Sequence, residues 1–534
     1  MSPAPLAPPR PVGAPLDAAG AEASAAATRD LLDVAFTRAA GAPLVRGNQV
    51  RLLRDAAENY PAWLDAIQGA ERTVDFESYI IRDDASGERF AAALAERARA
   101  GVRVRLLYDW VGALGKTRGR FWEALRRAGV EVRIFNPLRL ASPLGWVHRD
   151  HRKTLTVDGR VGFITGLCVG DDWVGDPARG LEPWRDTGVE VRGPAVAPIV
   201  AAFERVWAEA HDPEARHAEA DDAPAAGAGP AYHRTPTGGD APGGDVAGGD
   251  VAVRVVASEP FAAGLFRLDQ LVAAAARERL WLTDAYFAGT SSYVQGLRAA
   301  ARDGVDVRLL VPGGTDIPVL RPLSRAGYRP LLRAGVRVFE WNGPMLHAKT
   351  AVADGRWARV GSTNLNLASW LGNYEMDLVV EDAGFAREME AMFLDDLAHA
   401  TEVVLEPRRA GRRWRAGTPP PVTPPGAGEA AAPSAARRHH HHRYHHRGSA
   451  GRATAGAVRL GNTVGAAIAA QRVLDPADAR IVAGAGALLL ALAVAAFVWP
   501  RLLAVPLAVL AVWFGAALVA QGWRLWRRRQ RRPT

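Results

Sequence analysis

An internal duplication constrains the fold of this chain more than any other feature of its sequence. Four segments of the first copy recur in the same order in the second: 73–79 (TVDFESY) with 280–286 (LWLTDAY), 98–107 (ARAGVRVRLL) with 301–310 (ARDGVDVRLL), 127–132 (RAGVEV) with 333–338 (RAGVRV), and 151–160 (HRKTLTVDGR) with 347–356 (HAKTAVADGR). Each copy alternates β-rich runs with helical runs. The repeat therefore predicts two duplicated α/β domains related by a pseudo-two-fold axis.

Changes in composition suggest where these domains begin and end. The stretch between the copies contains GGDAPGGDVAGGD, which buries too little apolar surface to order itself. We divide the 534 residues into a disordered entry segment (1–43), a first domain (44–212), a flexible linker (213–250), a second domain (251–408), a basic His, Arg and Pro-rich tether (409–480), two transmembrane helices (481–523) and a basic tail (524–534).

Charge and cysteine content narrow the classes of function. A net charge of +9 draws the protein toward anionic surfaces, either nucleic acid or a membrane rich in acidic lipid. The single cysteine, Cys168, excludes an intrachain disulfide and a thiolate metal cluster within one chain. The fold must therefore rest on packing alone.

Each copy carries the pattern His-x-Lys-x4-Asp-Gly. The residues are His151, Lys153 and Asp158 in the first copy, and His347, Lys349 and Asp354 in the second. Only three of the 66 basic residues are lysines, and two of them fall in these motifs, so chance is a poor explanation. Side chains two residues apart in a strand share a face, so each histidine projects beside a lysine. The Asp-Gly that follows predicts a hairpin turn, in which the aspartate organises the site rather than attacks.

Two imidazoles beside two ammonium groups suit phosphodiester chemistry. A neutral imidazole can attack phosphorus while a protonated one donates to the departing alkoxide. The lysines would offset charge on the non-bridging phosphate oxygens, a role that Mg²⁺ often fills elsewhere. We therefore expect neither a metal nor another cofactor.

On these residues the chain resembles the phospholipase D superfamily over about residues 44–406. The resemblance implies two facing α/β/α sandwich domains, with one of His151 and His347 forming a phosphohistidine and the other acting as acid and then base. It also implies phosphate-holding and supporting positions after each motif and a downstream carboxylate for each histidine. These are Gly361, Ser362 and Asn364 in the second copy, Gly166 in the first, and the carboxylates Asp186 and Glu375. The first copy departs from the pattern because Cys168 stands where the family usually has Asn.

Within the superfamily, the cardiolipin synthases match best. The resembling stretches are GNQVRLLRDAAENYPAWLDAI, ESYIIRDDASGERFAAAL, WVHRDHRKTLTVDGRVGFITG and CVGDDW. The resemblance implies a phosphatidyltransferase that joins two phosphatidylglycerols and releases glycerol, so the expected partners are an anionic phospholipid and a membrane rather than nucleic acid. A phospholipase D or nuclease is the alternative enzyme, and a catalytically silent lipid-binding scaffold is the alternative outside enzymes. The sequence makes no prediction of oligomeric state.

The end of the chain predicts membrane attachment. Residues 481–523 contain a single charge, Arg501, between two apolar runs that are each about long enough to span a bilayer. The arginine-rich residues 524–534 favour the cytoplasmic side, and two crossings would leave the catalytic domains there too, on the inner membrane. The histidine-rich tract at 437–447 could bind metal, but its interleaved arginines favour a solvated basic tether.

Overall fold

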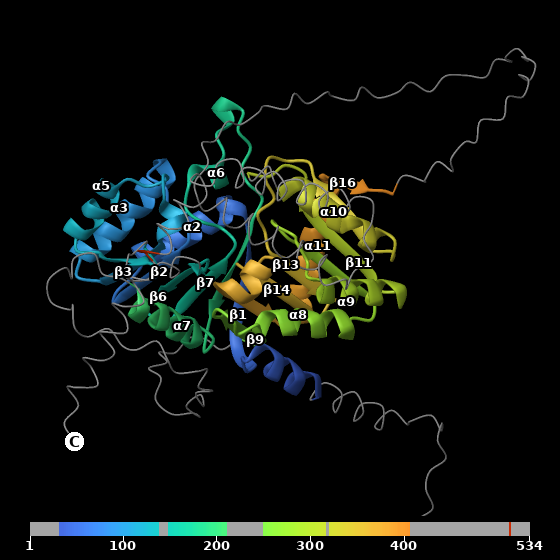
Figure 1. The fold of residues 1–534 in the computed structure, drawn as a ribbon. Coiled ribbons are helices and arrows are strands. Elements are labelled where there is room, and N and C mark those ends of the chain that lie inside the picture. Colours follow the sequence, from blue (N-terminus) through green and yellow to red (C-terminus); the bar gives the residue numbers. More distant parts are fainter. Residues whose placement is uncertain (1–30, 138–147, 211–248, 317–319, 406–511, 514–534) are drawn as a thin grey trace, which may run out of the picture.

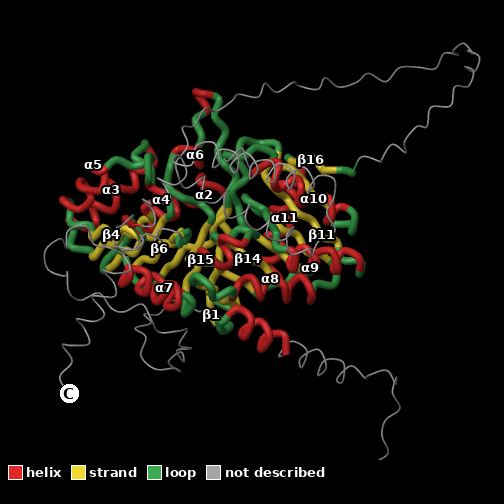
Figure 2. Tube along the Cα trace, viewed as in Figure 1, coloured by secondary structure: helices red, strands yellow, loops and turns green. Residues whose placement is uncertain are grey.

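The computed structural model describes residues 31–137, 148–210, 249–316, 320–405 and 512–513. Within them two α/β halves lie side by side and share one sheet (Figure 1). The strands run through the middle of the molecule and the helices cover them from outside (Figure 2). Residues 31–40 form a helix that precedes the first strand, in place of the disorder expected for this part of the entry segment, because Asp33 and Thr37 of this helix bind the buried Arg254.

The first half is a strand-rich unit whose helices alternate with its strands. Its elements are β1 (Val45–Arg54), α2 (Asp55–Gln68), β2 (Thr73–Ser78), α3 (Ala85–Arg99), β3 (Arg103–Asp109), α4 (Trp110–Ala113), α5 (Gly119–Arg127), β4 (Glu131–Phe135), β5 (Arg149–Asp150), β6 (Lys153–Val157), β7 (Val161–Thr165), α6 (Asp171–Val174), η2 (Pro177–Arg179), β8 (Thr187–Arg192) and α7 (Val196–Glu209).

The second half repeats this order of elements. Its elements are β9 (Val251–Ser258), α8 (Gly264–Ala275), β10 (Arg279–Thr283), α9 (Ser291–Arg302), β11 (Asp306–Pro312), α10 (Leu320–Leu332), β12 (Arg337–Trp341), β13 (Thr350–Ala353), β14 (Trp357–Gly361), η3 (Ala368–Gly372), β15 (Asn373–Val380), α11 (Ala383–Ala398) and β16 (Ala400–Val403).

The sheet has the same strand order on either side of its centre. From the antiparallel pair β1 and β9, the first half runs β1-β8-β7-β6-β2-β3-β4 and the second runs β9-β15-β14-β13-β10-β11-β12, ending on β16. In each half the last three equivalent strands are parallel and the others antiparallel. This matching order confirms the duplicated α/β fold.

Three large apolar clusters form the core of the molecule, one in each half and one between the halves. One lies under α2, α3 and α5 of the first half, and a second under α8, α9 and α10 of the second half. The third lies between the halves, where α7 and α11 cover β7, β8, β14 and β15. Because strands of both halves line this third cluster, burial of apolar surface also holds the two halves together.

The register of the second strand in each copy differs by one residue from the sequence alignment. The Asp158 carboxylate accepts from the backbone N–H of Thr73, and the Asp354 carboxylate accepts from that of Arg279 in the same way. Thr73 is therefore equivalent to Arg279, not to Leu280. The second copy has one more residue between this point and Tyr286 than the first copy has before Tyr79, so an alignment on the two tyrosines displaces the strands by one residue.

Several expectations fall on other parts of the chain. The proposed linker, the basic tether and the hairpin at 481–523 lie outside the described residues, except for the short described stretches at their edges and the pair 512–513. Among the helices that the structure describes, none combines the length and the apolar character needed to cross a bilayer.

Candidate active site

The two motif histidines stand at the starts of equivalent strands. His151 lies two residues before β6, which begins at Lys153, and His347 lies three residues before β13, which begins at Thr350. Lys153 and Lys349 are buried, with exposed fractions of 2% and 0%. Each lysine Nζ donates to the backbone carbonyl of the histidine two residues earlier. The i and i+2 relation in the sequence therefore places one imidazole and one ammonium together in each half.

Each histidine is held by a carboxylate from the opposite half. His151 Nδ1 lies 2.9 Å from Glu375 Oε2, which belongs to the second half. His347 Nδ1 lies 2.7 Å from Asp186 Oδ2, which belongs to the first. Both carboxylates are fully buried. Each histidine thus pairs with a carboxylate of the other half. In this crossed site, neither half alone contains a histidine together with its carboxylate.

Backbone hydrogen bonds fix the same crossing. The His151 N–H donates to the Tyr374 carbonyl at 2.9 Å, and the His347 N–H donates to the Arg185 carbonyl at 2.7 Å. β5 pairs in parallel with the start of β15, directly before the histidine and the carboxylate. Main chain and side chain therefore bring each motif to the other half's carboxylate.

Both imidazoles are neutral in this setting. Burial, opposed by Glu375, lowers the pKa of His151, and burial together with the Lys349 ammonium lowers the pKa of His347 to about 3. A neutral ring that donates Nδ1–H to a carboxylate presents its Nε2 lone pair. Lys349 Nζ also lies 2.9 Å from His347 Nδ1. The ionised Asp186 carboxylate can only accept a hydrogen bond, so its 2.7 Å contact requires the proton on Nδ1 and leaves Nδ1 unable to accept from Lys349.

The lysine of each half-site affects the pKa of the histidine in the other half-site. The Lys349 ammonium contributes to the lowered pKa of His151, and the Lys153 ammonium contributes to that of His347. Burial, and to a smaller extent Lys153, lowers the pKa of Lys349 to about 8. Each half-site therefore carries a positive charge that acts on the histidine of the other half.

Aromatic rings surround the histidines. The Tyr79 ring centre lies 4.9 Å from that of His151, edge on. Around His347 the ring centres of Trp173, Trp184 and Tyr286 lie 5.7, 5.8 and 5.9 Å away. These rings help to bury the imidazoles, and burial is the largest cause of the lowered pKa values.

The positions after each motif differ between the halves. Ser362 Oγ donates to Glu375 Oε2 at 2.6 Å and so braces the carboxylate that holds His151. Gly166 is the equivalent residue, and a Cβ there would meet Asp186 Oδ1 at 2.1 Å. Asn364 is buried, and its Oδ1 has no hydrogen-bond partner among the described residues. Cys168, its equivalent, is also buried.

The motif aspartates lie away from the imidazoles. Asp158 and Asp354 occupy the turns at the far ends of the motif strands, five residues beyond each lysine and so on the order of 15 Å along the strand. Their φ values are 54° and 51°, and each is followed by a glycine of positive φ, as the Asp-Gly pattern predicts. Each carboxylate accepts three backbone N–H groups from the segment that opens β2 or β10.

Some residues of the site escaped the sequence reasoning. Trp173 donates its indole N–H to Asp186 Oδ2 at 3.1 Å, and Arg185 makes an ion pair with Asp396 of α11. Arg152 lies within the first motif and is completely buried. The sequence contained a signal for Arg152 and Arg185. Arg152 lies inside a motif and Arg185 lies beside a predicted site carboxylate, and arginine is rare at such core positions.

Comparison with known proteins gives a consistent family. A family model described as "Cardiolipin synthase, PLD-like domain" matches residues 63–171 and 270–397, one segment in each half. Cardiolipin synthase A of Pseudomonas aeruginosa (strain PAO1) is 35% identical over 384 residues, 71% of this chain and 73% of the relative. Cardiolipin synthase of Halalkalibacterium halodurans is 31% identical over 381 residues, 71% of each chain.

A solved structure shares the fold. The phosphatidylserine synthase of Haemophilus influenzae Rd KW20 superposes with a TM-score of 0.53 at 13% sequence identity, covering 69% of this chain and 92% of that one. At this identity the likeness concerns the architecture alone.

Proposed function

Because this chain belongs to the cardiolipin synthase family of phospholipase D-like enzymes, we propose that it transfers the phosphatidyl group of one phosphatidylglycerol to a second and releases glycerol. The observation that carries this proposal is the crossed pair of buried imidazoles, His151 on Glu375 and His347 on Asp186. Two neutral imidazoles with oriented Nε2 atoms suit a double displacement at phosphorus.

The chemistry needs one histidine in each of two states. One Nε2 attacks phosphorus, forming an N–P bond as the bond to the glycerol oxygen breaks. The other imidazole enters protonated and gives its proton to that oxygen, since the bound phosphodiester anion favours an imidazolium beside it. It then takes the proton from the hydroxyl of a second phosphatidylglycerol, whose oxygen displaces the first histidine from phosphorus. Either histidine fits either role.

The remaining side chains support the phosphate. Lys153 and Lys349 would neutralise charge on the non-bridging oxygens. Ser362 would act through Glu375, and Gly166 through the space that it leaves for Asp186. The Nδ2–H₂ group of the buried Asn364 would donate to a phosphate oxygen. Cys168 offers no equivalent group, so the second half would supply most of the neutral donors. The aspartates Asp158 and Asp354 would hold the motif strands in register.

A product assay tests the proposal. The purified full chain is incubated with phosphatidylglycerol in mixed micelles, and cardiolipin, phosphatidic acid and glycerol are measured. We expect cardiolipin and glycerol in equal amounts, with His151→Ala and His347→Ala at least about 10³-fold slower. His399→Gln is the matched control, because His399 lies at the exposed end of α11.

Other products would redirect the assignment. Phosphatidic acid without cardiolipin identifies a phospholipase, and choline or nucleotide released from phosphatidylcholine or DNA identifies the alternative substrates. A folded protein that forms no product and no acid-labile phosphohistidine adduct would be the silent scaffold, and the transferase proposal would fail.

We also propose that residues 481–523 anchor the enzyme in the inner membrane, with the catalytic halves on the cytoplasmic side. The support is the two apolar runs and the arginine-rich end that follows them. A chain ending at residue 480 should leave the membrane fraction yet turn over micellar phosphatidylglycerol. Retention of the truncated chain in salt-washed membranes would contradict the anchor.

A further inference from the structure

Two buried guanidinium groups lie behind the histidines, and the catalytic scheme uses neither. Arg185 is 5% exposed and Arg152 is 0% exposed. A buried arginine is rare unless every donor has a partner, because removing its charge from water is costly. The hydrogen-bond and ion-pair partners of each arginine therefore indicate which groups it holds in place.

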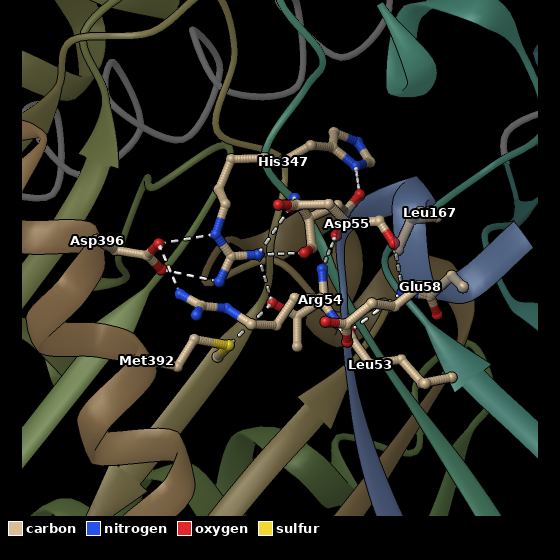
Figure 3. Close-up of polar contacts among 12 residues, drawn as sticks. Leu53, Arg54, Asp55, Glu58, Leu167, His347, Met392 and Asp396 are labelled. Atoms are coloured by element: carbon tan, nitrogen blue, oxygen red, sulfur yellow. Dashed lines mark hydrogen bonds and ion pairs between the residues drawn. The ribbon is translucent and has the colours of Figure 1, made fainter.

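Arg185 links three parts of the chain around Asp186, the residue whose carboxylate holds His347. It forms a bidentate pair with Asp396 of α11, at 2.8 and 2.9 Å. Its Nη1 donates to Asp55 Oδ1 at 3.1 Å and to the backbone carbonyl of Asp186. Figure 3 shows Asp396 at the left of this group of contacts, with Asp55 and His347 to its right. Asp55 in turn accepts from the Asp186 N–H at 2.8 Å.

Arg152 does the same behind His151. Its Nε donates to the backbone carbonyl of Glu375 at 3.2 Å. Its other nitrogens donate to the carbonyls of Ala202 in α7 and Ser258 in β9, both at 3.1 Å. The ring of Tyr374 lies 5.4 Å from its guanidinium carbon.

These two guanidiniums occupy equivalent places in the pseudo-symmetric molecule. Each donates to the backbone carbonyl of the carboxylate residue that holds a histidine. Each also reaches the end of the central strand, at Asp55 after β1 or Ser258 in β9, and the last helix of a half. The strand registers pair Ser258 with Glu375 and Arg54 with Thr187, which makes Asp55 the counterpart of Ser258.

The guanidiniums reach these equivalent places from different positions in the chain. Arg152 is the middle residue of the first motif, and its counterpart in the second motif is the buried Ala348. Arg185 directly precedes Asp186, and its counterpart before Glu375 is Tyr374, whose hydroxyl instead donates to Glu209 of α7 at 2.8 Å. At each site one of the two positions supplies the arginine, and the other residue leaves room for it or packs against it.

We propose that Arg152 and Arg185 are positioning residues, each of which fixes the carboxylate that orients the opposite half's histidine, and that the site accepts the guanidinium from either chain position. This inference rests on the proposed function, since it explains how that site is held in place. A carboxylate displaced by about 1 Å no longer aligns its imidazole with phosphorus, and such misplacement costs on the order of 100-fold in rate.

A transplant between the two sites tests the inference. Arg185→Tyr gives the site of His347 the residue found before Glu375, and we expect kcat to fall about 100-fold with KM nearly unchanged. Adding Ala348→Arg brings a guanidinium from the motif position, as Arg152 does in the other half. The kcat of this double variant should be at least about tenfold above that of Arg185→Tyr. Ala348→Arg alone places two guanidiniums in one site and should be slower than the wild type.

A spectroscopic readout separates this inference from the proposed function. In protein labelled with ¹⁵N-histidine, the hydrogen-bonded Nδ1 proton of His347 should be present in the wild type, lost in Arg185→Tyr and regained in the double variant. This readout needs no substrate, so absence of cardiolipin synthesis would count against the function alone. The reciprocal pair, Arg152→Ala and Arg152→Ala with Tyr374→Arg, repeats the test at His151 if the first double variant does not fold.

Two results would overturn the inference. One is an Arg185→Tyr protein with wild-type kcat and an unchanged His347 signal. The other is a pair of double variants that unfold at the wild-type midpoint but recover neither rate nor the imidazole signal.

Discussion

At the scale of single residues, Gly166 and Ser362 show how the two half-sites reach the same arrangement with different chemistry. Ser362 braces the longer Glu375 through its hydroxyl. Gly166 contributes only the absence of a side chain, because the Asp186 carboxylate occupies that space. Asp186 is braced instead by the Trp173 indole and the Thr187 N–H. The copies have therefore diverged in the groups that support an identical hydrogen bond to histidine.

Gly166→Ala should inactivate the enzyme without unfolding it. Its Cβ would lie 2.1 Å from Asp186 Oδ1, so the carboxylate must move off His347, and we expect a rate loss of about 100-fold. Gly296→Ala is the matched control, since a Cβ there meets only the Ala273 Cβ at an ordinary 3.7 Å. Turnover and the unfolding midpoint are measured for both. Equal turnover of the two variants would show that Asp186 tolerates displacement.

The depressed pKa of His347 makes stability depend on pH in a stated direction. The folded state keeps this imidazole neutral down to about pH 3, whereas the unfolded chain binds its proton near pH 6.5. The unfolded state binds more protons between these values, so acidification lowers the unfolding free energy by up to about 1.4 kcal/mol per pH unit. Carboxyls with a raised pKa, such as Asp377 at about 6, contribute the opposite slope.

His347→Gln should therefore flatten the loss of stability on acidification relative to the wild type. Denaturant unfolding at pH 7.5, 6 and 5 gives the slope of the unfolding free energy against pH for both proteins. The contribution of the carboxyls, which both proteins share, cancels in the difference between the two slopes. Parallel curves for His347→Gln and the wild type would mean that His347 is protonated in the folded protein.

The residues of the motifs could be predicted from the sequence, but their pairing could not. The spacing of His151 and Lys153 is a property of one strand, so it is visible in a short stretch of sequence. The family resemblance implies Asp186 and Glu375 as the histidine partners, yet nothing in the local sequence shows that each one holds the other half's ring. That crossing depends on how the halves associate, as do the partners of Arg152 and Arg185.

At the scale of elements, the Asp-Gly turns fix the motif strands to their neighbours. The Asp158 carboxylate accepts the N–H groups of Glu71, Arg72 and Thr73 at 2.9, 2.7 and 2.7 Å. Partial burial opposes ionisation, but these hydrogen bonds outweigh it and lower the pKa of Asp158. The turn was predictable because Asp-Gly favours positive φ locally. The one-residue shift of register in β10 was not, because the tertiary cap on Asp354 decides it.

Asp158→Ala should destabilise the protein more than it slows the chemistry. It removes three backbone partners and leaves alanine at a φ of 54°, which together cost about 2 to 3 kcal/mol for a partly exposed group. Asp158→Asn should cost less, because asparagine accepts a hydrogen bond and tolerates this φ. Urea unfolding and kcat are compared for both variants. A 10³-fold fall in kcat at unchanged stability would instead assign Asp158 to the reacting groups.

At the scale of the whole molecule, the crossed site makes the pair of halves the functional unit. The antiparallel β1 and β9 join the two halves of the sheet, and an apolar cluster drawn from both halves packs between them. The buried Asn48 strengthens this joint by donating to the Val45 and Val251 carbonyls and accepting from the Ala195 N–H. The repeat predicted two domains, but the continuous sheet and the shared core follow from three-dimensional association, which a one-dimensional pattern does not contain.

Cutting the chain between the halves should therefore leave an active enzyme. A protease site inserted in residues 213–248 and cleaved after folding breaks the connection between α7 and β9, while β1, β9 and the shared cluster stay paired. We expect the fragments to co-migrate on size exclusion and to retain most of the turnover. Denaturing and diluting the cleaved enzyme should then abolish activity, since His151 separates from Glu375 and His347 from Asp186. A separated first half that formed product alone would contradict the crossed site.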